Sequence, residues 1–537
     1  MLELAGRTSA GAEALAALRP RAPRLLWLLG GAVVLPAAIP IVYLLWTVVR
    51  PGGFDVGGFS TERLVELAAS TAVLTVAVTV TTMGLGLATA WLTTRTDLPG
   101  AAVWSTLVTI PLVIPSYVGA MAMLAASGNN GMLTQLFEGL GLPGLPVFKG
   151  FWATWAALSL WNFSFVHLLT VPVLRRLDPG LEEVSRGLGA GRWRTLRAIV
   201  FPQLRPALAS SALLVSLYVL SEFGAVSMLR YETFTRAIYT QFAGRLDTGP
   251  ALFLAGLLST AALVVVMIQQ WARGRATLYS NRPNRVAVTH RLSRSGRVGA
   301  FGLLGSIVGL ALVLPMATMT WWAVRGVSLG NSPLSVIPHT TRSVIISILA
   351  AAVIAVAAVP IAILVVRFPG RRARFLESIS WLTYSLPHLA IGLAFLVLAV
   401  RLARPIYQTV VLLVLVYLAM FLPVALAAVE SGMRRVAPGL EEVSRSLGMG
   451  SWETIRKVTI PLVRRSVLAG GALVFLSVMK ELPATLLLRP TEFDTLPVRI
   501  WSATEELFYT QASFAALALI AVSAIPLYLF VVRDIHE

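Results

Sequence analysis

The sequence predicts an all-α polytopic membrane protein with about twelve transmembrane helices in two parallel six-helix repeats. Of its 537 residues, 57% are hydrophobic and only 13% are charged, whereas a soluble chain carries roughly twice that charged fraction. A hydrophilic segment also occurs twice, because residues 175–202 and 434–461 are identical at 17 of 28 positions without a gap. Each copy interrupts a series of apolar stretches, which indicates two homologous halves.

Apolar runs of roughly 20 residues, long enough to cross a bilayer as helices, recur along the whole chain. In the first half we expect spans at 25–49, 67–94, 101–125, 151–174, 207–229 and 251–271. In the second half we expect them at 299–323, 342–366, 376–400, 408–430, 467–488 and 512–532. The run at 25–49 is too long for the apolar region of a signal peptide, so we interpret it as an uncleaved first span.

A polar, basic connector at 272–298 divides a first half at 1–271 from a second half at 299–537. The first half has about a dozen extra residues. Ile114-Pro115 and its counterpart Leu386-Pro387 are 272 residues apart, whereas the two copies of the doubled segment are 259 apart, so we assign the extra residues to 126–150, which lies between these landmarks. An even number of spans in each half makes the repeat parallel, and we expect a substrate path where the halves meet.

The net charge of +19, from 44 basic and 25 acidic residues, is unevenly placed. The segments 175–206, 272–298 and 434–465 carry seven Lys or Arg each, whereas 126–150 and 402–407 carry one each. This is the positive-inside bias, which predicts that both copies of the doubled segment and both termini are cytoplasmic. The charge therefore reflects membrane topology, and we expect no nucleic-acid partner. Cysteine is absent, which excludes disulfides and thiolate metal sites.

The first copy of the doubled segment has residues that typically start and end helices, and they predict two short helices. Asp178 and Pro179 suit a helix start, and Glu182 and Glu183 then lie near its positive end. Glycines then allow the left-handed backbone conformation that ends a helix. A second helix is expected from about residue 192, and a proline precedes the next span. The residues involved are Gly189, Gly191 and Pro202, and their counterparts in the second copy are Gly448, Gly450 and Pro461.

The second copy keeps Glu441 and Glu442 but has Ala437 in place of the capping aspartate, which predicts a weaker helix start. A generic cytoplasmic loop is the competing interpretation. We favour the generic loop less, because both copies retain the acidic pair, the glycines and the proline at fixed spacing, whereas ordinary loops tolerate change.

The spacing resembles a motif of the permease subunits of binding-protein-dependent ABC importers. That motif reads Glu-Ala-Ala, three residues, Gly, nine residues, Ile, one residue, Leu-Pro. Counting back from the terminal prolines places its Glu at Glu183 and Glu442 and its Gly at Gly189 and Gly448. The chain departs mildly from it, with Val-Ser for the Ala pair and Phe201 or Ile460 for the Leu. The resemblance covers nearly the whole chain, as two fused permease halves.

The resemblance implies that the short helix of each copy docks on an ATP-binding subunit, whose closure switches the path. One chain would then meet two ATP-binding subunits, together with an extracytoplasmic substrate-binding protein, in the bacterial inner membrane. The three lysines follow no glycine, so no phosphate-binding Gly-Lys loop is present and ATP must be bound by a partner. We expect a transport subunit with no enzymatic activity, cofactor or metal of its own.

Ionisable residues inside spans are candidates for the translocation path, and Glu222 and Glu481 share the offset of 259. They either line the path or form a structural pair, for example Glu481 with Lys480 or a nearby arginine. His167 and His388, which also lie in spans, are more simply explained as packed or hydrogen-bonded side chains.

The segments 221–239 and 480–496 resemble ferric-iron importer permeases, which implies ferric iron as the substrate. Thiamine, sulfate or molybdate, and phosphonate remain alternatives with the same architecture. An ion-coupled secondary transporter would need more intramembrane acids and no doubled docking segment. A membrane-embedded enzyme would need a metal-ligand or nucleophile motif, and neither HExxH nor GxSxG occurs.

Overall fold

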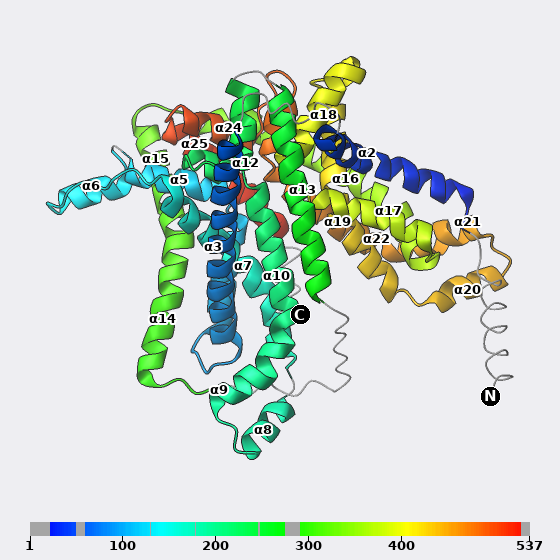
Figure 1. The fold of residues 1–537 in the computed structure, drawn as a ribbon, viewed down its shortest axis with the longest axis horizontal. Coiled ribbons are helices and arrows are strands. Elements are labelled where there is room, and N and C mark those ends of the chain that lie inside the picture. The colour runs from blue at the N-terminus through cyan, green and yellow to red at the C-terminus, as the bar shows by residue number, and fades with distance from the viewer. Residues whose placement is uncertain are drawn as a thin grey trace. The chain divides into compact units, whose positions relative to one another are not determined.

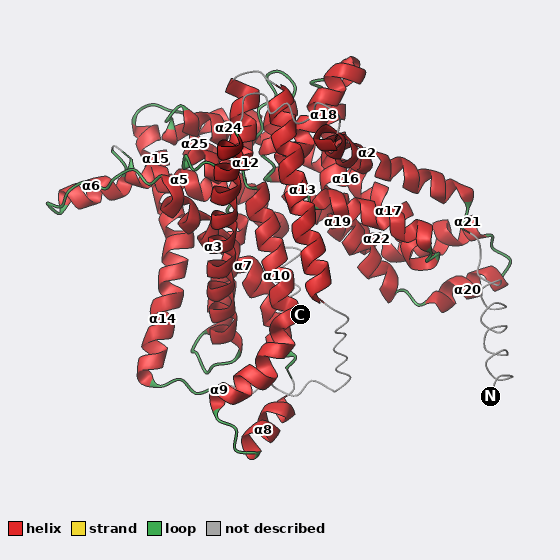
Figure 2. Ribbon diagram, viewed as in Figure 1, coloured by secondary structure: helices red, strands yellow, loops and turns green. Residues whose placement is uncertain are grey.

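The structure is a computed structural model that describes residues 22–49, 60–128, 130–177, 179–244, 248–273 and 290–527. The described chain is built from helices joined by short loops (Figures 1 and 2). Ten of these helices are long and apolar enough to cross a membrane, or up to twelve if two bent pairs each count as one span. The predicted all-α polytopic class is confirmed. Asp178, both termini and residues 274–289 of the predicted connector lie outside the described residues.

The helices of the first half follow the predicted order. They are α2 (Arg24–Val49), α3 (Thr61–Thr94), α4 (Ala101–Thr109), 3₁₀ turn η1 (Ile110–Val113), α5 (Ser116–Ser127), α6 (Met132–Gly139), α7 (Gly150–Arg175), α8 (Pro179–Gly187), α9 (Arg192–Thr195), π turn η2 (Leu196–Val200), α10 (Phe201–Ser221), α11 (Gly224–Met228), α12 (Phe234–Tyr239), π turn η3 (Thr240–Gly244) and α13 (Thr248–Arg273).

The second half repeats this order. It contains α14 (Arg294–Val308), π turn η4 (Gly309–Val313), α15 (Leu314–Ser328), 3₁₀ turn η5 (Pro333–Val336), α16 (Ile337–Arg367), α17 (Arg371–Tyr384), α18 (His388–Leu402), 3₁₀ turn η6 (Arg404–Ile406), α19 (Val410–Arg435), α20 (Pro438–Ser446), α21 (Ser451–Thr454), π turn η7 (Ile455–Thr459), α22 (Ile460–Met479), α23 (Pro483–Leu488), α24 (Leu496–Glu505) and α25 (Tyr509–Leu527). Helix α6 falls within the extra residues assigned to 126–150, where the second half has only η6.

Four predicted spans differ from the structure in an informative way. The predicted spans 101–125 and 376–400 fall on broken pairs, α4–η1 with α5–α6 and α17 with α18, and the second pair bends by 104°. Pro115 and Pro387 stand at the breaks, where a residue without an N–H and with a fixed φ interrupts the helical ladder. The predicted spans 207–229 and 467–488 instead end early, at Ser221 and Met479.

The described chain forms two compact units that do not coincide with the two sequence halves. The first unit contains residues 22–41, 346–384 and 414–478, and the second contains residues 42–345, 385–413 and 479–527. Each unit therefore combines helices from both halves.

In the second unit, α3, α7, α10 and α13 pack side by side (Figure 1). Helices α3 and α7 approach closely at Gly86, where an added Cβ would lie 2.4 Å from Cβ of Val166. The first helix of the second half, α14, packs on this first-half bundle. Its Leu304 and Ile307 share a buried apolar cluster with Val108 of α4 and Phe163 of α7.

The first unit shows the reciprocal arrangement, because α2 of the first half packs on helices of the second. Thr383 of α17 donates a hydrogen bond to the carbonyl oxygen of Ala37 at 2.9 Å. A Cβ added at Gly30 would lie 2.9 Å from Cδ1 of Leu364 and 3.3 Å from Cδ1 of Leu376. In the second unit α14, the first helix of the second half, packs on helices of the first half. In the first unit α2, from the first half, packs on helices of the second half.

The close approach of α3 and α7 can be tested by replacing Gly86 with alanine. The added methyl group must displace Val166 or the helix backbone, so we expect Gly86→Ala to destabilise the protein by about 1–3 kcal/mol. The melting temperature of the purified protein in detergent should fall accordingly. Gly84→Ala is the matched control, because nothing lies within 4 Å of its added Cβ and alanine favours a helix by up to about 1 kcal/mol. Equal melting temperatures for the two variants would contradict this packing.

Candidate functional site

The structure separates the two adjacent glutamates in each copy of the doubled segment. In the first copy, Glu182 of α8 is 2% exposed, whereas Glu183 is exposed. The buried carboxylate forms an ion pair with Arg95, which is itself fully buried at the C-terminal end of α3. Glu182 therefore attaches α8 to the end of α3 and leaves Glu183 available to solvent or a partner.

The second copy repeats this division with different details. Glu441 of α20 is buried and accepts from Nε of Arg367 at 2.8 Å, while Glu442 is exposed. Thr459 donates to the same Glu441 oxygen at 3.0 Å, and Nη2 of Arg367 donates to the carbonyl oxygen of Val436 at 3.2 Å. Because an uncompensated buried charge is costly, each arginine is expected to hold its helix firmly.

Each copy is also closed into a helical hairpin. Gly189 and Gly448 have φ of +80° and +87°, the left-handed conformation that ends α8 and α20. The hydroxyl groups of Ser185 and Thr195 lie 3.0 Å apart, and their counterparts in the second copy, at positions 444 and 454, lie 3.1 Å apart. The sequence interpretation did not assign a role to these hydroxyl pairs, although their identity in both copies was a visible signal.

The hairpins continue into the next long helix through a π turn in both copies. The turns η2 and η7 occupy equivalent positions, and Pro202 and Pro461 follow directly in α10 and α22. A proline at that position cannot donate to the regular helical ladder, which is consistent with a shifted hydrogen-bond register there. The spanning helix therefore connects without a loop to the hairpin.

The outer face of each hairpin is apolar and exposed. In the first copy the exposed residues are Leu181, Val184, Leu188 and Trp193, and in the second they are Leu440, Val443, Leu447 and Trp452. Both hairpins lie in the basic segments that topology predicts to be outside the lipid. A repeated apolar patch beside an exposed glutamate has the composition of a protein-docking surface.

Glu222 and Glu481 lie at helix breaks rather than within spanning helices. Glu222 follows the last residue of α10, is 8% exposed, and accepts from the N–H of Ala225 in α11 at 2.9 Å. Its other oxygen accepts from the hydroxyl of Ser116 at 2.8 Å. Ser116 follows Pro115 at the first bent pair. One carboxylate thus joins two interruptions of the helices.

Glu481 has equivalent contacts in the second half. It is 5% exposed, accepts from the N–H of Ala484 in α23 at 3.0 Å, and lies 2.8 Å from Nδ1 of His388. His388 follows Pro387, as Ser116 follows Pro115, so a histidine replaces a serine at this point of the repeat. Lys480, considered from sequence as a partner of Glu481, instead donates to the carbonyl oxygen of Leu112 at 2.9 Å.

The two breaks are joined across the halves. The hydroxyl of Tyr117 donates to the carbonyl oxygen of Lys480 at 3.4 Å. A Cβ added at Gly224 would lie 2.6 Å from Cβ of Tyr117 and 3.1 Å from Leu482, so only glycine fits between the two halves there. Phe223 also lies 4.8 Å, between ring centroids, from Trp501. We call the group formed by Ser116, Tyr117, Glu222, His388, Lys480 and Glu481 the central cluster.

His167 has an ordinary structural environment, as expected. It is buried with Nδ1 3.0 Å from the hydroxyl of Thr89 and Nε2 3.2 Å from that of Ser105. Within the described part of the chain, no three His, Asp or Glu side chains are placed to hold a metal ion together.

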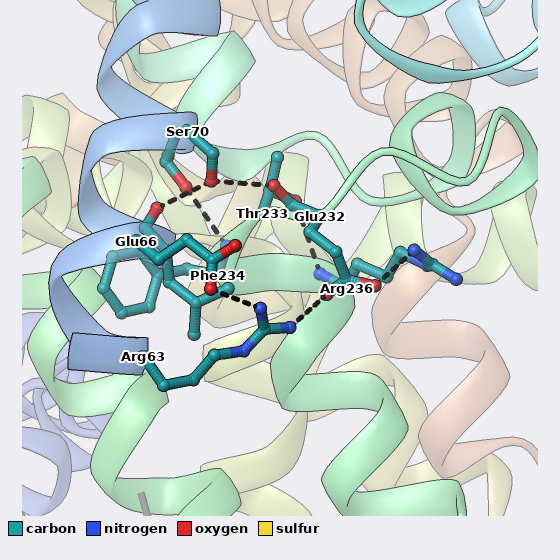
Figure 3. A network of polar contacts seen from close by, with 9 residues as sticks. Arg63, Glu66, Ser70, Glu232, Thr233, Phe234 and Arg236 are labelled. Carbon is teal, nitrogen blue, oxygen red and sulfur yellow. Dashed lines mark hydrogen bonds and ion pairs between the residues drawn. The ribbon is translucent and has the colours of Figure 1, made fainter. Parts of the chain in front are cut away.

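A polar network joins the N-terminal end of α3 to the segment 232–236 (Figure 3). Arg63 contacts Glu66 at 2.7 Å and Glu232 at 3.4 Å, and Arg236 also pairs with Glu232. Thr235, in the same segment, donates to the carbonyl oxygen of Glu222 at 2.6 Å. Helix α3 therefore contacts α8 of the first hairpin at one end, through Arg95, and the segment that bonds Glu222 at the other.

The contacts of Glu222 predict a structural requirement for its carboxylate. Glu222→Ala would leave the N–H of Ala225 and the hydroxyl of Ser116 without this acceptor, and each loss should cost about 1–3 kcal/mol. Glu222→Gln keeps an acceptor oxygen and should cost less. Thermal unfolding of both variants in detergent tests this order, and a Glu222→Ala protein as stable as the parent would contradict it.

The chain is similar to known transport proteins over most of its length. The profile of the family described as the binding-protein-dependent transport system inner membrane component matches the chain twice, at residues 81–276 and 356–535. The Fe(3+)-transport system permease protein FbpB 2 of Haemophilus influenzae is 31% identical over 514 residues, covering 95% of this chain and 98% of that protein.

Two further relatives show how far the similarity extends. The ferric transport system permease protein FbpB of Actinobacillus pleuropneumoniae is 24% identical over 82% of this chain and 67% of that protein. The molybdenum transport system permease protein ModB of Escherichia coli is 30% identical over only 35% of this chain but 83% of that protein. Because the family profile covers most of the chain in two copies, the chain belongs to the binding-protein-dependent transport system inner membrane component family, as a duplicated multi-pass ABC-importer permease.

Proposed function

We propose that the chain is the permease of an ATP-driven importer of ferric iron, which receives its substrate from an extracytoplasmic binding protein. The observation that carries this proposal is the near full-length similarity to a ferric-iron permease, over 95% of the chain. The molybdenum permease is a shorter protein that aligns over 83% of its own length but only 35% of this chain, so the choice of iron depends on the full-length match. Iron is therefore favoured over an oxyanion, while the binding protein would determine most of the specificity.

The two hairpins support docking to two ATP-binding subunits. Each presents an exposed glutamate and an exposed apolar face, and each is attached to the membrane helices by a buried arginine–glutamate pair. Force applied to α8 or α20 would reach the long helices α3 and α16 through those pairs. The basic residues of both hairpins and of the connector support a cytoplasmic location, and an even number of spans in each half would place both termini on the same side.

The central cluster supports a substrate path that passes between the halves. Glu222 and Glu481 hold equivalent helix breaks, and Lys480 and Tyr117 link those breaks across the halves. In transporters built from repeats, broken helices typically form the substrate site at the interface of the repeats. We infer that Glu222 and Glu481 border the path and act by positioning the broken helices.

Removing both exposed glutamates should uncouple ATP hydrolysis from transport. In proteoliposomes that contain the complete importer, Glu183→Ala with Glu442→Ala should lower ATP-driven iron uptake at least about tenfold, the loss of roughly 1.4 kcal/mol of coupling. The protein should still fold, because both side chains are exposed. Glu62→Ala, an exposed acid at the other end of α3, is the control. Uptake that is unchanged in the double variant would remove the docking role.

The substrate and the energy source have separate tests. Titration of the cognate binding protein with ferric iron, molybdate, sulfate, a phosphonate and thiamine should show tight binding of iron only. Preferred binding of another compound would overturn the iron assignment but leave the importer intact. Uptake into vesicles that persists without ATP would instead indicate a secondary transporter.

A further inference from the structure

The end of the connector, from residue 290, is attached to the residues that follow α3, close to α8 of the first hairpin. The N–H of His290 donates to the carbonyl oxygen of Arg95 at 2.8 Å, and the N–H of Asp97 donates to the carbonyl oxygen of His290 at 3.2 Å. These two bonds form a short parallel bridge between the connector and the residues that follow α3. They flank Thr96, and the residue before it, Arg95, pairs through its guanidinium with Glu182 of α8.

Side chains strengthen this attachment. The carboxylate of Asp97 accepts from the N–H of Leu292 at 2.8 Å and from Nη2 of Arg297 at 2.7 Å. These two contacts lower the pKa of Asp97 below its usual value, so the carboxylate is ionised at neutral pH. Leu292 packs on the buried cluster that contains Leu98 and the core-facing residues of α14.

The attached segment also contacts α8 directly. The ring of His290 stacks on Trp91 with centroids 5.5 Å apart, and the guanidinium of Arg95 lies 5.6 Å from the centroid of that tryptophan. Nδ1 of His290 lies 3.5 Å from Nη2 of Arg186 on α8. Residues 290–297, which we call the strap, thus contact α8 both directly and through Arg95.

We propose that the strap positions the first coupling hairpin and connects it mechanically to α14, the first helix of the second half. Asp97, His290 and Arg297 are its positioning residues. The proposal rests on the proposed docking role of α8, and it adds a second route for force. A pull on α8 would reach α3 through Arg95 and α14 through the strap, so that one docking event moves helices of both halves.

The absence of cysteine allows a direct measurement on the full chain. A spin label at Leu188→Cys reports on the end of α8, and one at Leu447→Cys reports on the equivalent point of α20; these positions are 83% and 74% exposed. Asp97→Asn with Arg297→Gln opens the strap. In nanodiscs, without ATP or partners, it should shorten the rotational correlation time of the label at 188 by about twofold and leave the label at 447 unchanged.

Arg294→Gln is the matched control, because it removes the same charge one turn earlier in α14 without altering the described contacts of Asp97. A label at 188 that does not respond to the opened strap, or labels at 188 and 447 that respond equally, would overturn the proposal. The spectrum does not depend on the ATP-binding subunit. Unchanged uptake in the glutamate variants at 183 and 442 would therefore defeat the docking role while leaving the result for the strap intact.

Discussion

A backbone that crosses lipid must satisfy every peptide N–H and C=O within the protein, and this constraint governs the unusual features of the chain. Continuous helices meet it without help. Where the helices break, at Ser116 and His388 and after Ser221 and Met479, side chains must supply the missing acceptors. Glu222 and Glu481 do so, each bonding one N–H of the following short helix and one side chain at a proline break. The two buried carboxyl groups are therefore explained first by the helix breaks, and the position of those breaks supports the proposed path between the halves.

The acidic pair of the doubled segment also divides between an inward and an outward contact. Two adjacent side chains on a helix point roughly 100° apart, so Glu182 and Glu183 meet different surroundings on this short surface helix. The first is used inward, on Arg95, and the second outward. The second copy has the same division, but its arginine, Arg367, also bonds a carbonyl oxygen, and Thr459 shares its glutamate. The two hairpins are alike in architecture and differ in the contacts that hold them.

Sequence patterns predicted the class, the repeat and the hairpin because each depends on local periodicity or on glycine and proline. They could not separate Glu182 from Glu183, because the choice is made by Arg95, which is distant in the chain and adjacent only after folding. Hydropathy carried two predicted spans past Ser221 and Met479, because the residues after each break are again apolar. Pro115 and Pro387 were recognised as landmarks of the repeat, but a break there becomes evident only once the helices are placed. Partners such as His388 for Glu481 depend on tertiary packing and have no local signal.

The exchange of first helices has a consequence for biosynthesis. Helix α2 is made before the residues it packs on, because Leu364, Leu376 and Thr383 belong to the second half. The faces of α4 and α7 around Val108 and Phe163 likewise wait for α14. Neither half can complete its own packing as it leaves the ribosome, so the first half must remain in the membrane with unfilled surfaces until translation of the second has advanced. Joining the halves in one chain keeps the missing partner close by and makes their stoichiometry one to one.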